Sequence, residues 1–417
     1  MIRKKILLIS YYYPPCNQIS GNRVESFATN LSEKYETIVL TRYWRGNEQV
    51  FGYYLKEDLN QEIKKINDNL IIHYLPFKKK KEYKGVINKL YSLYNYIIGN
   101  LNFEDNLVDI NLKYCEELFK TWKPDLVICS TPPLSLLKLS YMINKRYNLP
   151  FVVDFRDFEN QIVLNKKSKL SLNENILFKL KEIHTVRFLK KSILNTTINN
   201  QFIAYFKNKK INNFKLVLNG YKQEHFITNY NTKNEIFKII SMGTIYNGQN
   251  INVFLDGSKL FLLNNPNAKV SIEFYGINHN DPIQSSIKSK IYNAKIFNRV
   301  PHSEAIKIMC ESDILFYPTW VNYSGMYSGK IFEYLGAKSN ILIAPTDEDV
   351  IEALLEETNA GEVANTPEEV FSYLERKYNE WLSKGYLDYD GIENKINFYS
   401  RENQASILQK EIEKILK

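Results

Sequence analysis

Short apolar runs alternate with longer amphipathic stretches along the 417 residues of the chain. This alternation is typical of β–α–β units built around parallel sheets. In the first half of the chain it predicts strands at 4–10, 36–41, 69–76, 123–131, 149–157 and 214–221. Apolar residues recur at helical intervals between these runs, which predicts helices over about 22–34, 86–120, 134–148 and 174–191.

A polar, turn-rich stretch, 222–235, interrupts this series and is the expected domain boundary. A second series of strands and helices follows from residue 236, and 398–417 has the pattern of an amphipathic helix. We therefore expect an α/β protein with two doubly wound domains, 1–221 and 222–396. A C-terminal helix, 397–417, is expected to pack back on the first domain.

Composition narrows the protein class without naming a function. The chain is 44% hydrophobic and 24% charged, as in globular proteins. Its net charge of +9 is scattered apart from the lysine run in 77–85, whereas a nucleic-acid binder would concentrate it. We expect no nucleic-acid partner. The excess charge favours solubility first, and attraction to anionic phosphates or an anionic membrane second.

Cysteine usage and hydropathy indicate a cytoplasmic protein. The four cysteines form no Cys-x-x-Cys pair, which argues against a disulfide framework and a zinc site; they are Cys16, Cys115, Cys129 and Cys310. The opening MIRKKILLIS reads as a strand and not as a signal peptide. No apolar run approaches the roughly 18 to 20 residues that span a bilayer.

The segment 77–101 combines lysines with aromatic and aliphatic residues at helical spacing. Such a segment can lie on an anionic bilayer, here the inner face of the plasma membrane. A helix packed in the N-terminal domain with solvated lysines explains the same pattern, so both interpretations stay open.

Several motifs, taken in order, resemble the family-four glycosyltransferases. They are YYYPP and SGNRVESFATNL, KPDLVICSTPPLSLL, LPFVVDFRD, VLNGYKQEHF, SMGTIYNGQN, RVPHSEAIKIMCESDILF and GKIFEYLGAKSNILIA. Within that family the chain looks most like the branch acting on bacterial capsule and lipopolysaccharide sugars. The resemblance implies the GT-B architecture, in which two Rossmann-like domains face each other across a cleft.

The same resemblance implies a reaction. A sugar would pass from a nucleoside-diphosphate sugar to a glycan or lipid-linked glycan acceptor, with retention of anomeric configuration. No cofactor is expected, and no metal is expected to be required. The donor sugar, its base, the acceptor, the linkage and the oligomeric state stay open.

The resemblance assigns the donor diphosphate to the segment YSGKIFEYLGAKSNIL, 327–342. Ser328, Gly329 and Lys330 would present a helix N-terminus and a cation to the phosphates, and Lys330 would stabilise the leaving group. Glu333, one turn later on the same face, would accept the ribose hydroxyls. The alternative is a plain Lys–Glu pair on a surface helix.

Further donor contacts are implied in two loops. Gly243 and Gln249 belong to GTIYNGQN, and Arg299 and Val300 belong to NRVPHSEA, which fits the loop that receives the base edge. Gln249 stands near the place where relatives commonly have a basic residue, so Arg299 or another cation would have to compensate.

Three neighbouring positions leave alternatives open. Many relatives have a glutamate where this chain has Gly325, so backbone N–H groups of 322–329 would have to hold the sugar. In the base loop, Ser303 is equally well explained as a helix N-cap and His302 as a loop histidine.

The opening motif suggests an acceptor-side loop. Pro14-Pro15 end the first strand, Gly21 allows a backbone geometry or a close approach, and the helix starting near Asn22 would point its N–H groups at the ligand. Arg23, in the first turn, would add charge. The alternative is a strand–helix connection with a buried arginine pair.

Two further strand ends carry candidate acceptor-side residues. Ser130 and Thr131 lie in STPPL, and VVDFRD supplies Asp154, Arg156 and Asp157. A carboxylate there would orient or deprotonate an acceptor hydroxyl, and Arg156 would bind phosphate or hold the carboxylates. An internal Asp–Arg salt bridge is the structural alternative.

Other functional classes find less support in the sequence. There is no Ser-His-Asp set, metal-spaced histidine cluster or P-loop, and the acids of DED, 347–349, fit the start of a helix. A nucleotide-sugar epimerase would need cleft acids and histidines that are not visible. A noncatalytic module that binds sugar nucleotides or glycans is the alternative from another class, favoured by Gly325 and Gln249.

Overall fold

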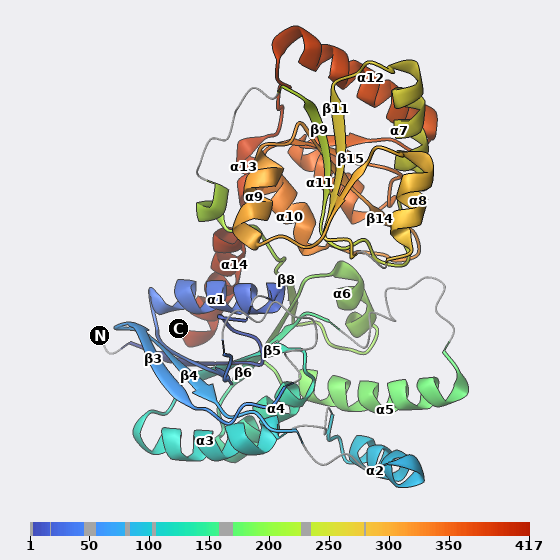
Figure 1. Ribbon diagram of the computed structural model, residues 1–417. Helices are drawn as coiled ribbons and strands as arrows, with labels where there is room; N and C mark the ends of the chain where they lie inside the picture. Colours follow the sequence, from blue (N-terminus) through green and yellow to red (C-terminus); the bar gives the residue numbers. More distant parts are fainter. Residues whose placement is uncertain are drawn as a thin grey trace. The chain divides into compact units, whose positions relative to one another are not determined.

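The computed structural model describes residues 3–16, 18–45, 56–79, 84–101, 106–157, 170–226, 235–278 and 281–417. The chain divides into two compact units, which are coloured along the sequence in Figure 1. Unit 1 comprises Met1–Leu218 and Gln404–Lys417, and unit 2 comprises Asn219–Asn403. Each is an α/β unit built on its own sheet.

Within the described residues, the sheet of unit 1 has eight strands in the order β3-β4-β2-β1-β5-β6-β7-β8. All neighbours pair in parallel except β3 with β4. The central strands are buried, which explains why they read as unbroken apolar runs in the sequence. The strands are β1 (Lys5–Ser10), β2 (Glu36–Arg42), β3 (Glu62–Asn67), β4 (Leu70–Leu75), β5 (Leu126–Thr131), β6 (Phe151–Phe155), β7 (Leu194–Thr197) and β8 (Phe214–Leu216).

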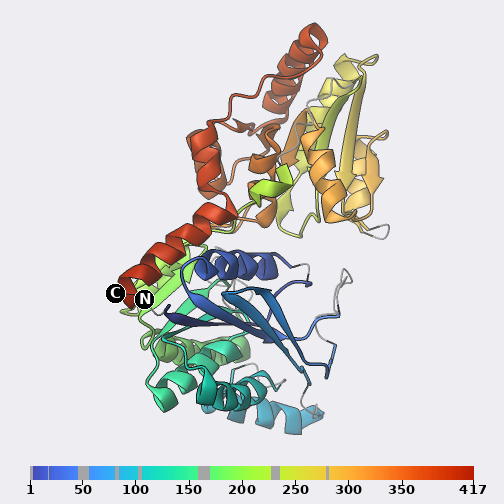
Figure 2. The same ribbon diagram turned by 90° about the vertical axis from the view of Figure 1, so that its left-hand side faces the viewer.

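Helices cover both faces of this sheet. Figures 1 and 2 show α1 on one face and α3 and α4 on the other. The helices of unit 1 are α1 (Ile19–Ser32), α2 (Gly85–Ile97), α3 (Leu107–Thr121), α4 (Ser135–Tyr147), α5 (Leu172–Leu189), α6 (Asn200–Lys207) and α14 (Arg401–Leu416), which belongs to unit 1 from Gln404 onward. The side-chain amide of Gln409 on α14 donates to the carbonyl of Asn30 on α1 at 2.8 Å, and the Gln404 amide oxygen accepts from Leu218 N at 2.8 Å.

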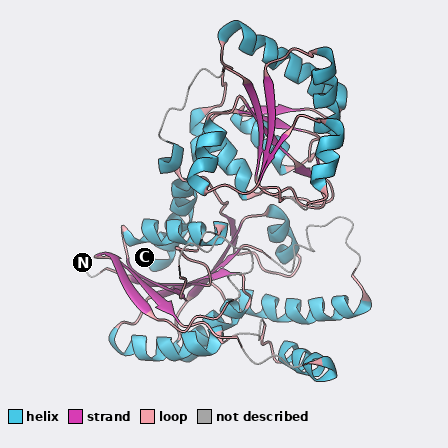
Figure 3. Ribbon diagram, viewed as in Figure 1, coloured by secondary structure: helices cyan, strands magenta, loops and turns pink. Residues whose placement is uncertain are grey.

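In the part of unit 2 that the structure describes, the sheet has six parallel strands in the order β12-β11-β9-β13-β15-β16. Figure 3 shows helices on both sides of it. Its strands are β9 (Phe237–Met242), β11 (Val270–Tyr275), β12 (Lys295–Phe297), β13 (Ile314–Tyr317), β15 (Asn340–Ile343) and β16 (Gly361–Val363), with a separate ribbon of β10 (Gln249–Asn250) and β14 (Thr319–Trp320). Its helical elements are η3 (Gln223–Phe226), α7 (Asn252–Asn264), α8 (Ile283–Lys290), α9 (His302–Cys310), α10 (Gly329–Ala337), α11 (Val350–Thr358), α12 (Pro367–Lys384) and α13 (Glu393–Phe398).

Several predicted elements differ from the structure. The helical stretch 86–120 is two helices, because Gly99 adopts a left-handed φ of 71° after α2. Helix α1 begins at Ile19, three residues before the expected start, and the strand expected over 214–221 ends at Leu216. Strand β3 was not predicted, because all six of its side chains are exposed and its sequence EIKKIN has no buried face.

The structure also shows how helices α9 and α11 begin, at the two loops that carry Ser303 and Asp347. Ser303 is not an N-cap, because α9 starts at His302 and the cap position is Pro301. Asp347 does open a helix, since its carboxylate accepts the backbone N–H groups of Ile351 (2.9 Å) and Glu352 (3.1 Å) on α11. Of the expected boundary stretch 222–235, residues 227–234 lie outside the described residues.

Candidate functional site

The strand order of unit 2 places a topological switch point between β9 and β13. From β9 the chain proceeds first to β11 on one side of it and later to β13 on the other. In parallel sheets, ligands bind beyond the carboxyl ends of the strands at such a point. The predicted donor-side residues Gly243, Ser328, Gly329 and Lys330 belong to loops and a helix start at these strand ends.

Tyr334 fixes helix α10 over the switch point. Its hydroxyl accepts a hydrogen bond from Met242 N at 2.8 Å and donates to the carbonyl of Phe316 at 3.3 Å. Met242 is the last residue of β9 and Phe316 lies within β13, so one buried side chain connects the helix to both strands. Buried polar groups are normally hydrogen-bonded, and the Tyr334 hydroxyl acts here as both acceptor and donor.

The N-terminus of α10 keeps its backbone N–H groups free of side-chain capping. Ser328 is the cap residue, but its hydroxyl shares a hydrogen bond of 2.9 Å with the Tyr317 hydroxyl and does not cap the helix. Gly329 is the first helical residue. Uncapped N–H groups at a helix start carry partial positive charge and favour anionic ligands.

Lys330 lies in the first turn of α10, and its Nζ donates to the carbonyl of Thr244 at 3.0 Å. The side chain is partly covered, and burial lowers the pKa of its ammonium to about 8, an effect that the nearby Glu333 carboxylate partly offsets. One of the three ammonium donors is thus satisfied by the loop after β9. The lysine and the loop after β9 therefore meet, although they are 86 positions apart in sequence.

Gly243 lies directly beside the Lys330 side chain. Its φ of 86° is left-handed, and a β-carbon built there would lie 3.6 Å from Lys330 Cε and 3.7 Å from Nζ. Its N–H donates to the carbonyl of Tyr275 at 2.8 Å, which joins the ends of β9 and β11. Glycine therefore keeps open the space that a side chain would take next to the ammonium.

Glu333 lies one turn further along α10 and has partners that the sequence did not reveal. Its Oε1 is 2.9 Å from His302 Nε2 and 3.9 Å from Arg401 Nη2. The His225 ring packs edge-on against His302 at 5.2 Å, and burial together with the charges of His302, Lys222 and Arg401 lowers the pKa of His225. The sequence left His302 open between a contact in the base loop and a plain loop histidine, and nothing in it indicated a contact across 31 positions.

Of the predicted base loop, 298–305, only residues 298–301 form a loop, which connects β12 to α9; the rest belongs to α9. Arg299 is exposed and Val300 is partly exposed. Because His302 follows directly and contacts Glu333, the loop is joined to the carboxylate predicted to bind ribose. The structure thus brings Val300, His302 and Glu333 to the same end of the unit 2 sheet.

Gln249 and Gly325 are both used structurally. The Gln249 amide donates to the carbonyl of Pro318 at 2.7 Å and accepts from Tyr246 N at 2.9 Å, so it links the β10–β14 ribbon to the loop after β9. Gly325 has a φ of 70°, and its N–H donates to Asp349 at 2.6 Å. A glutamate there would have to adopt a left-handed backbone, which gives a physical reason for the departure from relatives.

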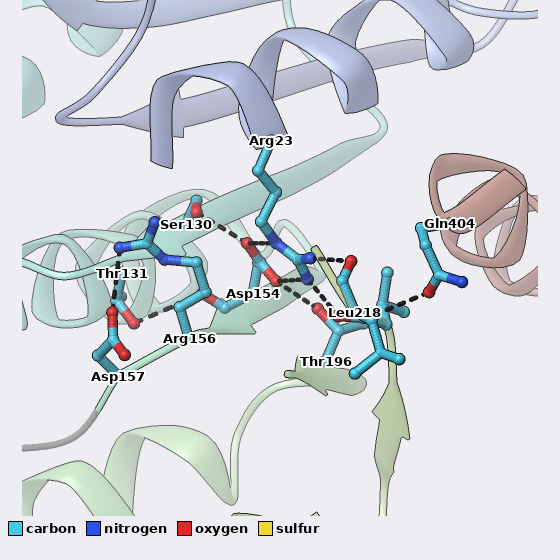
Figure 4. Close-up of polar contacts among 10 residues, drawn as sticks. Arg23, Ser130, Thr131, Asp154, Arg156, Asp157, Thr196, Leu218 and Gln404 are labelled. Carbon is cyan, nitrogen blue, oxygen red and sulfur yellow. Dashed lines mark hydrogen bonds and ion pairs between the residues drawn. The ribbon is translucent and has the colours of Figure 1, made fainter. Parts of the chain in front are cut away.

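In unit 1, Arg23 and Asp154 form a buried bidentate ion pair (Figure 4). The Arg23 Nε and Nη2 lie 3.1 and 2.8 Å from the two carboxylate oxygens, and the guanidinium also donates to the carbonyls of Leu218 (2.6 Å) and Val217 (2.8 Å). The pair joins α1, β6 and the segment after β8. It corresponds to the buried arginine pair left open as an alternative.

Hydroxyl groups complete the environment of Asp154. Ser130 and Thr196 each donate to it at 2.8 Å. Burial alone would raise the pKa of Asp154, but Arg23 and these hydroxyls hold it below its usual value. Proton transfer by Asp154 stays a prediction; the geometry favours a structural role, because the carboxylate is fully buried and both oxygens are occupied.

Arg156 and Asp157 follow at the end of β6 (Figure 4). The Arg156 Nη2 lies 3.2 Å from an Asp157 oxygen, and its backbone N–H donates to the carbonyl of Thr131 at 3.3 Å. The guanidinium is buried, and its Nε has no hydrogen-bond partner among the residues that the structure describes. Asp157 is half-exposed and so is the more accessible of the two candidate carboxylates.

Gly21 lies in the first turn of α1, where a β-carbon would meet the carbonyl oxygen of Cys16 at 3.1 Å. Glycine at this position therefore allows two backbone segments to approach closely, which is one of the two explanations given in the sequence analysis. Among the described residues, no group of three or more His, Cys, Asp or Glu side chains is arranged as a metal site.

Comparison with known proteins defines the fold. No model of a known protein family matches the sequence, and no curated protein matches it. Solved structures do match over nearly the whole chain. One is sucrose-phosphate synthase from Thermosynechococcus elongatus, at 10% identity and a TM-score of 0.62, which covers 99% of both chains.

Two other neighbours agree with it. An α,α-trehalose 6-phosphate synthase from Burkholderia multivorans is 12% identical, with a TM-score of 0.61 over 100% of this chain and 97% of its own. The E. coli trehalose-6-phosphate protein bound with UDP-2-fluoro glucose is 10% identical, with a TM-score of 0.61 over 98% of both chains. The chain therefore has the GT-B fold expected from the motifs.

Proposed function

We propose that the protein is a glycosyltransferase that uses a nucleoside-diphosphate sugar as donor. The observation that carries the proposal is the position of Lys330, at the uncapped start of α10 and beside Gly243. A diphosphate needs positive charge and N–H donors within a small space, and this end of the unit 2 sheet supplies both. The GT-B neighbour bound with UDP-2-fluoro glucose supports the same donor class.

The chemistry follows from the charges. As the bond between the sugar and the diphosphate breaks, negative charge develops on the leaving oxygen, and Lys330 with the helix N-terminus stabilises it. Glu333, oriented by His302, accepts hydrogen bonds from the ribose hydroxyls, and the 298–301 loop meets the base. The configuration at the anomeric carbon is retained, and no metal is required.

For the acceptor, we propose a growing bacterial surface glycan in the capsule, O-antigen or exopolysaccharide class, elongated in the cytoplasm. The motifs quoted above support this choice over a free sugar. Asp157 is the accessible carboxylate for the acceptor hydroxyl, and Arg156 binds a charged group of the acceptor.

A noncatalytic sugar-nucleotide-binding module is the second candidate. Two observations favour it: the amide of Gln249 is engaged with backbone groups, and Gly325 is anchored to Asp349. Neither position then supplies the charge that relatives place near the diphosphate (Gln249) or near the transferred sugar (Gly325). The module would bind the donor and release no sugar from it.

The test is a thermal-shift screen of UDP-, GDP-, ADP- and TDP-sugars, followed by measurement of sugar release and transfer with and without EDTA. We expect one donor to stabilise the protein, to turn over in the presence of EDTA, and to lose both effects in Lys330→Ala. Lys338→Asn, at the other end of α10, is the matched control, since asparagine tolerates the left-handed φ of 55° there. Stabilisation without turnover would favour the module, and no stabilisation would refute the proposal.

A further inference from the structure

Helix α2 of unit 1 exposes a continuous apolar face. Its large apolar side chains are between 38% and 72% exposed; they are Val86, Ile87, Leu90, Leu93, Tyr94, Ile97 and Ile98 just after the helix. A globular protein rarely leaves such a contiguous set uncovered, and where it does, the patch marks an interaction site. Figures 1 and 2 both show α2 as an outlying helix of unit 1.

These residues share one side of the helix. At 100° per residue, positions 86 to 98 of the set fall within an arc of about 140°. The opposite side faces the protein, where Asn95 is the one buried residue of α2 and its amide oxygen accepts from Asn100 at 2.7 Å. On the flank, Lys181 of α5 lies 4.9 Å over the Tyr96 ring. The helix is thus attached to unit 1 by its polar side and presents its apolar side outward, the reverse of a helix that packs on a core.

The charged side chains described on α2 and directly before it are lysines. Lys84 and Lys89 are exposed at the border of the apolar face, and Lys78 and Lys79 are exposed just before it. Residues 84–101, which include α2, contain no acidic residue. Residues 80–83 of the preceding lysine run lie outside the described residues.

We propose that the α2 face docks on an anionic lipid bilayer. Apolar side chains enter the headgroup region, the flanking lysines meet lipid phosphates, and Tyr94 suits the interface between the two. A second copy of the chain is less well matched, because it would bring the same lysines against one another. The 13 residues of α2 are about 20 Å long, too short for the roughly 30 Å hydrocarbon core, so the helix lies on the membrane. Among the described residues no helix is long and apolar enough to cross a bilayer.

The inference goes beyond the proposed function and does not depend on it, because its test measures binding to vesicles and not catalysis. The full-length protein is sedimented with vesicles of phosphatidylcholine alone or mixed with phosphatidylglycerol. We expect binding to the anionic vesicles that weakens with added salt. Replacing Ile87, Leu90 and Ile97 with Gln should reduce the partition coefficient at least tenfold while preserving the helix, since glutamine is a good helix former.

Controls separate the surface from general stickiness and from misfolding. Leu263→Gln with Leu382→Gln removes two equally exposed apolar residues on helices of unit 2 and should leave vesicle binding unchanged. Lys84→Gln with Lys89→Gln removes only charge, so it tests the face even if the triple variant unfolds. Binding to neither vesicle type, or equal binding by the triple variant, would overturn the proposal. Self-association abolished by the triple variant, without vesicle binding, would assign the face to a second copy instead.

Discussion

Raising the pH from 7 to 9 should weaken the binding of a nucleoside diphosphate about tenfold, because Lys330 loses its charge in this interval. Burial lowers the pKa of Lys330 to about 8. A lysine with that pKa is about 90% charged at pH 7 and about 10% charged at pH 9, and the charged form is the one that binds phosphate. A lysine with the ordinary value would stay almost fully charged, and the affinity would be flat.

The assay is isothermal titration calorimetry with UDP at pH 7, 8 and 9. The terminal phosphate has a second pKa of about 6, so the ligand charge is nearly constant over this range. Binding at pH 9 should also take up close to one proton, which is read from buffers of different ionisation enthalpy. The stability of the free protein changes with pH in the opposite direction to the affinity. Between about pH 8 and pH 10.5 the unfolded chain binds more protons than the native protein, so the free energy of unfolding rises with pH there.

Two variants isolate the lysine. Lys330→Arg keeps its charge throughout and should bind with the same affinity at pH 7 and 9. Lys338→Asn, at the C-cap of the same helix, should retain the full pH dependence. The reasoning is refuted if the wild-type affinity is flat from pH 7 to 9, or if Lys330→Arg shows the wild-type slope.

Three other predictions concern single residues. Asp154→Asn should lower the free energy of unfolding by about 3 kcal/mol at pH 7, because it leaves a buried guanidinium uncompensated. Since the native pKa of Asp154 is lowered, this contribution is present above the usual pKa of an aspartate and is lost as the pH falls through the lowered value. Denaturant unfolding of both proteins at pH 7 and at a pH below the lowered value measures it. A difference in the free energy of unfolding below about 1 kcal/mol at pH 7 would contradict it. Gly243→Ala should lower the free energy of unfolding by about 1 kcal/mol and also weaken UDP binding in calorimetry. Gly385→Ala, with a similar φ of 79° at the end of α12, should lower stability alone. Equal UDP affinities of Gly243→Ala and the wild type would exclude Gly243 from the site. Glu333→Gln should weaken a ribonucleoside diphosphate about tenfold and leave its dideoxy analogue unchanged in competition binding, and equal losses would exclude a ribose contact.

The sequence predicts most of the sheet because buried parallel strands are continuous apolar runs. Strand β1, with Ile6 to Ile9 fully buried, is of this kind. It does not predict β3, whose pairing with β4 depends on backbone hydrogen bonds at an exposed edge and leaves no apolar period.

Contacts between distant positions were the part of the site that sequence reasoning could not supply. Arg23 was considered for ligand binding, yet it pairs with Asp154 across 131 positions because the sheet order brings β6 close to β1. Glu333 was placed correctly on α10, but its contact with His302 requires two loops to meet at the same end of the sheet. Local motifs predict which residues lie at strand ends, whereas strand order decides which of them meet.

A crystal structure of the full-length protein with bound UDP is the most direct test of the central claim, that Lys330 and the start of α10 hold the donor diphosphate. The account predicts phosphate oxygens within hydrogen-bonding distance of Lys330 Nζ and of the first-turn N–H groups of α10, with the phosphate lying over Gly243. UDP bound elsewhere, with no phosphate oxygen within reach of Lys330, would contradict it.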